Sequence, residues 1–97
     1  MRNLTLALTG MVLGSSAVAA TGYSATLAQP LAQKMEFVVG NNQFRCEGST
    51  CILISHPTDA GSVQTCRALH RRVGTLTSYI ARGKPFDAAK LEKCNAP

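Results

Sequence analysis

The sequence predicts a single small α+β domain: an antiparallel sheet built of hairpins, two helices that cover it, and two disulfides. Three observations lead to this fold class. Segments rich in β-forming residues come first after residue 20, and apolar residues at helical spacing come only later. The chain of 97 residues has four cysteines, an even number for its short length. Its first 20 residues have the composition of an export signal, which places the cysteines in an oxidising compartment.

Residues 1–20 are predicted to be a cleaved signal peptide. A short positive start is followed by an apolar run over residues 4–13 and then by small residues that favour cleavage after Ala19, or one residue later. The apolar run is shorter than the ~20 residues that a membrane span needs. Residues 21–97 then form one disulfide-stapled domain in the periplasm or outside the cell. Loss of one arginine with the signal lowers the net charge from +5 to +4.

Four strands are expected in the first half of this domain. Gly22–Leu27 alternates in polarity and should form a short strand at a sheet edge, because Pro30 follows it closely. Met35–Val39 is rich in β-formers, and the residues after it tolerate the positive φ of a turn. Two further strands flank Gly48-Ser49, which suits a two-residue type II′ loop with glycine at its first position.

This hairpin brings two cysteines together. With Gly48-Ser49 as the loop, Cys46 and Cys51 form a non-hydrogen-bonded pair, whose Cα atoms approach to about 4.5 Å. That separation lies at the short end of the range that a disulfide accepts. Ile52 and Ile54 then lie on the other face of the hairpin, where they need cover from another element or from a partner.

The second half predicts helix, strand and helix, so the element order is β-β-β-β-α-β-α. Ser62 can cap a helix that runs through Val73. Thr75–Ala81 is typical of a strand, and Gly83–Pro85 should turn the chain. Asp87 can then cap a last helix.

The remaining cysteines, Cys66 and Cys94, both fall on the buried sides of these two helices. Four cysteines allow three pairings, and the hairpin geometry favours Cys46–Cys51 with Cys66–Cys94. A four-cysteine zinc site is the alternative, but the sequence lacks paired C-x₂-C spacing and the compartment is oxidising. The spacing Cys46-x₄-Cys51 also differs from the C-x-x-C of redox enzymes. We therefore expect a scaffold without a metal or a cofactor.

Catalytic motifs are not apparent in the sequence. The two histidines, His56 and His70, have no Asp or Glu at a recognisable spacing, and G-x-S-x-G, H-E-x-x-H and P-loop patterns are absent. We therefore expect no catalytic residues, and a small hydrolase or redox enzyme is the least favoured alternative. Such an enzyme would require a histidine to meet a carboxylate or a thiol in a pocket.

The concentration of charge on the first helix is a candidate contact for an anionic partner: Arg67, His70, Arg71 and Arg72, with Arg45 and Arg82 as further members if the fold brings them near. Lipid headgroups or an acidic envelope protein would suit it. Nucleic acid is disfavoured because the net charge is modest and no aromatic residues interleave the arginines. The favoured interpretation is a solvated helix face whose cations complement the helix dipole.

Four motifs resemble a family of uncharacterised small exported proteins from alphaproteobacteria: Tyr23-x-Ala25-x-Leu27-Ala28-x-Pro30, Cys46-x-Gly48-x-x-Cys51, Thr65-Cys66-Arg67-x-Leu69-x-x-x-Val73-Gly74 and Leu91-x-x-Cys94-Asn95. The similarity covers essentially the whole mature chain. One departure is Phe44, at a position where the family pattern has tryptophan. The resemblance implies a Gram-negative envelope location and carries over no activity and no catalytic residue.

The expected function is therefore a non-enzymatic periplasmic or secreted module that binds a partner or interacts with the envelope. A second hypothesis is a small inhibitor of an extracytoplasmic enzyme, in which the disulfide-braced loop Glu47–Thr50 enters a foreign active site. We expect no transmembrane anchor once the signal has been removed.

Overall fold

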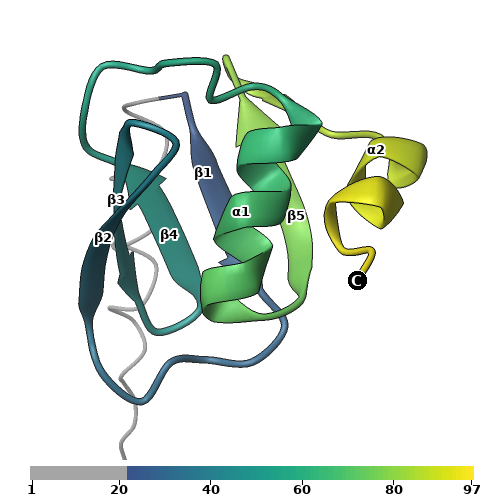
Figure 1. Cartoon of the computed structure of the whole chain (residues 1–97). Helices are drawn as coiled ribbons and strands as arrows, with labels where there is room; N and C mark the ends of the chain where they lie inside the picture. Colours follow the sequence, from purple (N-terminus) through teal and green to yellow (C-terminus); the bar gives the residue numbers. More distant parts are fainter. Residues whose placement is uncertain (1–21) are drawn as a thin grey trace, which may run out of the picture.

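The computed structural model describes residues 22–97, so the predicted signal peptide lies outside the described residues. Six antiparallel strands form one sheet, and two helices complete the fold in the order β-β-β-β-α-β-β-α (Figure 1), which confirms the α+β class. The elements are β1 Ser24–Leu27, β2 Met35–Val39, β3 Asn42–Glu47, β4 Thr50–Leu53, α1 Val63–Val73, β5 Leu76–Ala81, β6 Lys84–Pro85 and α2 Ala88–Cys94. Neither helix is long and apolar enough to cross a membrane.

Tight turns join the neighbouring strands. Gly48 has a φ of 60° between Glu47 and Thr50, as a type II′ loop requires, so the predicted hairpin is confirmed. The β5–β6 turn is different, because Arg82 and Gly83 both have positive φ, 55° and 77°. That combination is a type I′ turn, in which glycine or asparagine is normally preferred at both positions.

The first strand lies in the middle of the sheet, so the prediction of an edge strand was wrong. The strand order is β2-β3-β4-β1-β5-β6, and Ala25 pairs with Cys51 on one side and with Tyr79 on the other. Pro30 follows the end of β1 by three residues, so it limits the length of the strand and leaves both of its edges free to pair.

The turn predicted at Gly83–Pro85 also needs correction. The turn residues are Arg82 and Gly83, while Lys84 and Pro85 form the short strand β6, opposite Ala81 and Ile80. Proline is tolerated there because β6 is the edge of the sheet and no further strand needs its missing N–H group.

The core lies between the sheet and α1. Helix α1 lies against the sheet (Figure 1), and its buried residues are Thr65, Cys66, Leu69 and Val73. Tyr79 is the largest fully buried side chain, and its hydroxyl donates a hydrogen bond of 2.5 Å to the carbonyl of Ala60. This bond satisfies a polar group that would otherwise be costly to bury.

Both predicted disulfides are present and all four cysteines are fully buried. Cys46–Cys51 joins β3 to β4 with a Cα–Cα distance of 4.0 Å, and Cys66–Cys94 joins α1 to α2 with one of 5.4 Å. Helix α2 has only seven residues and would be unstable alone, so the second bond holds it against the domain.

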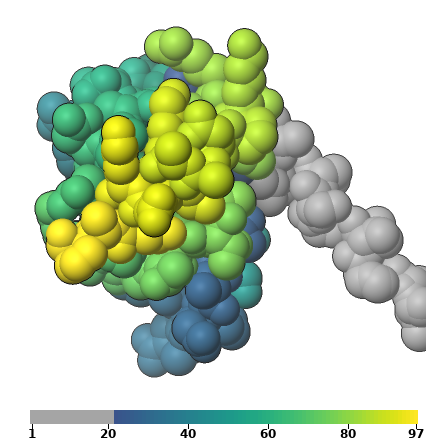
Figure 2. Space-filling view, turned by 90° about the vertical axis from the view of Figure 1, so that its right-hand side faces the viewer, coloured from purple at the N-terminus to yellow at the C-terminus, as the bar shows by residue number. Residues whose placement is uncertain are grey.

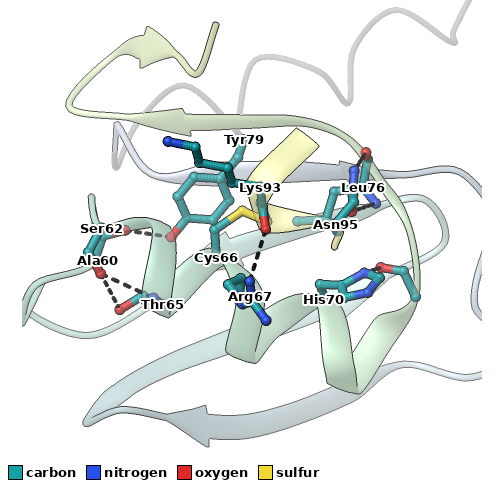
Figure 3. Close-up of a disulfide and its surroundings, with 12 residues drawn as sticks. Ala60, Ser62, Thr65, Cys66, Arg67, His70, Leu76, Tyr79, Lys93 and Asn95 are labelled. Carbon is teal, nitrogen blue, oxygen red and sulfur yellow. Dashed lines mark hydrogen bonds between the residues drawn. A yellow bond between two sulfur atoms is a disulfide. The ribbon is translucent and has the colours of Figure 1, made fainter. Parts of the chain in front are cut away.

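Two asparagine side chains form hydrogen bonds with backbone N–H and carbonyl groups of distant segments. Asn42 is fully buried, and its amide exchanges two hydrogen bonds of 2.7 Å with the backbone of Thr58. Asn95, at the end of α2, accepts from the N–H of Leu76 at 2.9 Å and donates to its carbonyl at 2.8 Å (Figure 3). These contacts fix the loop before α1 and the end of α2 to the sheet.

Candidate functional site

The cations predicted on α1 do not converge on one site. Arg67 donates to the carbonyl of Lys93, in the last turn of α2, at 3.5 Å, and to that of Pro97, beyond the end of α2, at 3.3 Å. His70 bonds the carbonyl of Gly74 at 3.0 Å (Figure 3). Arg72 turns the other way, and its guanidinium lies 4.4 Å from the centre of the Phe37 ring on β2.

Arg71 differs from these three residues. Its side chain is exposed and has no hydrogen bond or ion pair with another residue of the described part of the chain. The side chains of Arg67 and His70 contact the ends of the helices, and that of Arg72 contacts the edge strand β2, which gives these three residues a structural role. Within the predicted cluster, Arg71 is thus the side chain most available to a partner.

Arg45 and Arg82 do not join this cluster. Arg45 lies on the opposite face of the sheet, where its Nε is 2.8 Å from a carboxylate oxygen of Glu36. Both side chains are nearly half exposed, so this ion pair contributes little to stability. Arg82 lies in the β5–β6 turn, beside the start of α1 and far along the helix from Arg71.

The two histidines are also separate from one another. His56 is exposed in the loop after β4, and His70 is half-buried against the Gly74 carbonyl at the end of α1. Among residues 22–97, no group of three or more His, Cys, Asp or Glu side chains is placed to hold a metal ion.

The loop Glu47–Thr50 is fixed against the body of the domain. The carbonyls of Gly48 and Ser49 accept hydrogen bonds from Leu31 and Leu27, at 2.9 and 2.8 Å. Residues 48–50 are half-buried as a result. An inhibitory loop has to project into a foreign active site, and this geometry does not favour that role for the hairpin.

A cleft of about 870 Å³ lies beside the β5–β6 hairpin. The loop before α1 forms one wall, the hairpin the second, and the first turn of α2 the third. Three basic side chains line it: Arg82, Lys84 and Lys90. Two acidic side chains, Asp59 and Asp87, line it as well.

Several of these side chains are held in place. Arg82 donates from Nε to the hydroxyl of Tyr23 at 3.3 Å. The ammonium group of Lys90 lies 5.5 Å from the centre of the Phe86 ring. Asp87 accepts from the backbone N–H of Lys90 at 2.9 Å and so caps α2.

The sequence reasoning missed this cleft because three segments that are separate in the chain build it. The available signal was the dense run of charge and aromatic character from Arg82 to Lys90, directly after a strand. The sequence predicts a turn at Gly83–Pro85 and a helix cap at Asp87 within this run; the cap is confirmed, and the turn lies at Arg82 and Gly83.

The positive charge of the domain is unevenly distributed. Seven basic residues lie on α1, on α2 or at the cleft: Arg67, Arg71, Arg72, Arg82, Lys84, Lys90 and Lys93. Three acidic residues accompany them: Asp59, Asp87 and Glu92. The other charged residues of the described part cancel one another: Lys34, Glu36, Arg45 and Glu47. In Figure 2, α2 (yellow) and the β5–β6 hairpin (light green) face the viewer together, so the basic residues on these two elements lie on one face of the molecule.

Comparison with known proteins gives one match. A family model described as a family of unknown function (DUF8200) matches residues 7–96. No curated protein and no solved structure matches the chain. The match agrees with the predicted resemblance to an uncharacterised family, while export and a bacterial envelope location stay predictions.

Proposed function

Since the chain belongs to this family of unknown function, we propose its role from its own architecture: it is an exported, non-enzymatic binding module of the cell envelope. Two buried disulfides indicate a compartment other than the cytoplasm, because reducing conditions there disfavour such bonds. The apolar segment before residue 20, with its small residues at the predicted cleavage point, supports export by a signal peptide.

The polar groups of the interior support binding in preference to catalysis. Tyr79, Asn42 and Asn95 are engaged in backbone hydrogen bonds that hold loops and helix ends. His70 is used in the same way at the end of α1. These four side chains thus serve the scaffold, and a scaffold with a charged outer surface is suited to recognition.

The observation that carries the proposal is the asymmetry of charge. The two helices and the cleft lining have seven basic and three acidic residues, while the remaining four charges cancel, so the net charge of +4 belongs to these parts of the domain. Such a distribution orients a small protein toward an anionic surface and raises its association rate. We infer that the partner presents negative charge in the envelope.

A matched pair of double variants tests this proposal. Arg71→Gln with Lys93→Gln removes two charges from the helix side, and Lys34→Gln with Arg45→Gln removes the same number elsewhere. Binding of the oxidised mature protein to phosphatidylglycerol vesicles and to immobilised envelope proteins is measured over a series of salt concentrations. We expect the first pair alone to weaken binding and to flatten its salt dependence.

Two results would contradict the proposal. If both double variants lose the same affinity, net charge alone drives the interaction and the helix side has no special role. If the wild-type protein binds neither preparation at any salt concentration, an anionic envelope partner is wrong.

A further inference from the structure

Arg82 occupies a backbone position that does not favour arginine. Its φ of 55° lies in the left-handed region, where a side chain with a Cβ atom is less stable than glycine. The equivalent first position of the β2–β3 turn is occupied by Gly40, also with a φ of 55°. The turn itself therefore gains nothing from arginine, and an unfavourable conformation at a cleft is typical of a functional residue.

The guanidinium of Arg82 is oriented so that it can bind a ligand. Its Nε donates to the Tyr23 hydroxyl at 3.3 Å, which orients the group beside the cleft. Its other N–H donors have no hydrogen-bond partner among residues 22–97. Lys84 lines the same wall two residues further along, and no described residue forms an ion pair with it. A carboxylate that enters here meets two cations from one rigid hairpin.

The rest of the cleft lining indicates the class of ligand. Pro57, Pro85 and Phe86 provide apolar surface, and Asp59 introduces a negative charge on the wall opposite the hairpin. The Asp59 carboxylate can accept a backbone N–H, a donor that a peptide offers and that a phosphate ion lacks. The volume of about 870 Å³ lies within the range of ligand pockets, roughly 300–1,000 Å³, and exceeds the needs of a single ion.

We propose that this cleft binds an extended peptide segment of the partner, whose acidic side chain pairs with Arg82 and Lys84 while an adjacent apolar side chain packs against Phe86. The inference rests on the proposed binding function and specifies its ligand. Pro85 prevents the peptide from adding to the sheet as a further strand at this point, because proline lacks the N–H that a ladder requires. Recognition therefore depends on side chains, and on the charge of one carboxylate above all.

The experiment uses capped hexapeptides in which one Glu is flanked by Leu or Phe, with Gln versions of the same peptides as controls. Binding to the ¹⁵N-labelled oxidised mature protein is followed by NMR chemical-shift changes. We expect the Glu peptides to shift the signals of Arg82 Nε, Gly83 and Ser62, and to bind roughly tenfold to hundredfold more tightly than the Gln peptides.

Arg82→Gly is the critical variant, because glycine suits the turn and the fold is retained. It should reduce the affinity for the Glu peptides to that of the Gln peptides, while Lys34→Gln changes nothing. Unchanged affinity in Arg82→Gly would overturn the proposal, and so would inorganic phosphate that competes as well as the peptides do. Arg71→Gln separates this inference from the broader one: it weakens vesicle binding if the helix side is the docking face, and leaves peptide binding intact.

Discussion

The two disulfides should differ in their contribution to stability, and the difference can be worked out from their positions. Cys66 and Cys94 are separated by 28 residues, whereas Cys46 and Cys51 are separated by five. In the chain-entropy model these loops correspond to about 3.5 and about 2 kcal/mol, a difference of about 1.5 kcal/mol. All four side chains are fully buried, so truncation to alanine costs about the same at both sites and leaves this difference unchanged.

The perturbation is therefore a pair of double variants, Cys66→Ala with Cys94→Ala and Cys46→Ala with Cys51→Ala. Their free energies of unfolding are compared with that of the oxidised mature protein by urea titration, followed by far-UV circular dichroism. A domain of this size has a stability of the order of 5 kcal/mol, so the helix pair should leave it only marginally folded. Equal losses, or a larger loss from the hairpin pair, would refute the argument from loop length.

Two further predictions concern the side chains of Asn95 and Tyr79. Asn95→Ala should cost about 1–3 kcal/mol in urea unfolding, since it removes both side-chain bonds to Leu76. Asn95→Asp should cost at least as much, because it keeps the acceptor but sets its second carboxylate oxygen against the Leu76 carbonyl, at the negative end of α2. Burial, reinforced by Tyr23, raises the pKa of Tyr79 above its ordinary value of about 10. The folded state then holds a proton that the unfolded state releases, so stability should fall as the pH rises above about 10. Tyr79→Phe should lack that fall, and a wild-type protein without it would contradict this assignment.

The hairpin and its disulfide could be predicted because turn chemistry is local. Gly48 at the first loop position sets the register, the register places Cys46 opposite Cys51, and the structure has both. The caps at Ser62 and Asp87 follow from equally local signals, and both side chains accept the expected backbone N–H groups.

The place of the first strand could not be predicted in this way. Its partners are β4 and β5, and β5 begins nearly 50 residues after the end of β1. Only one clue was available locally, Pro30, and it limits the length of a strand without deciding its neighbours. Sheet order depends on packing against α1, which local patterns do not describe.

The candidate site shows the same limit. Arg71 and Arg72 are adjacent in sequence, but consecutive residues on a helix point about 100° apart. One is free at the surface, and the other stacks on Phe37. Conversely, Arg82 and Asp59 are distant in sequence and line one cleft. Proximity along the chain therefore predicted a larger cluster of basic side chains on α1 than the structure has, and it gave no indication of the cleft.

The central position of β1 changes what the disulfides do. Strands β2, β3 and β4 form one half of the sheet and contain Cys46–Cys51, while β5 and β6 form the other half beside the helices that Cys66–Cys94 joins. Neither bond crosses between β4 and β5, so the two halves meet through β1, which pairs with both strands, and through α1, which contacts both β2 and β5. Leu27 is the single large apolar side chain of β1, so the backbone hydrogen bonds of this strand to β4 and β5 contribute much of the link within the sheet. The disulfides thus stabilise each half separately, and the pairing of β1 with β4 and β5 joins the two halves into one sheet.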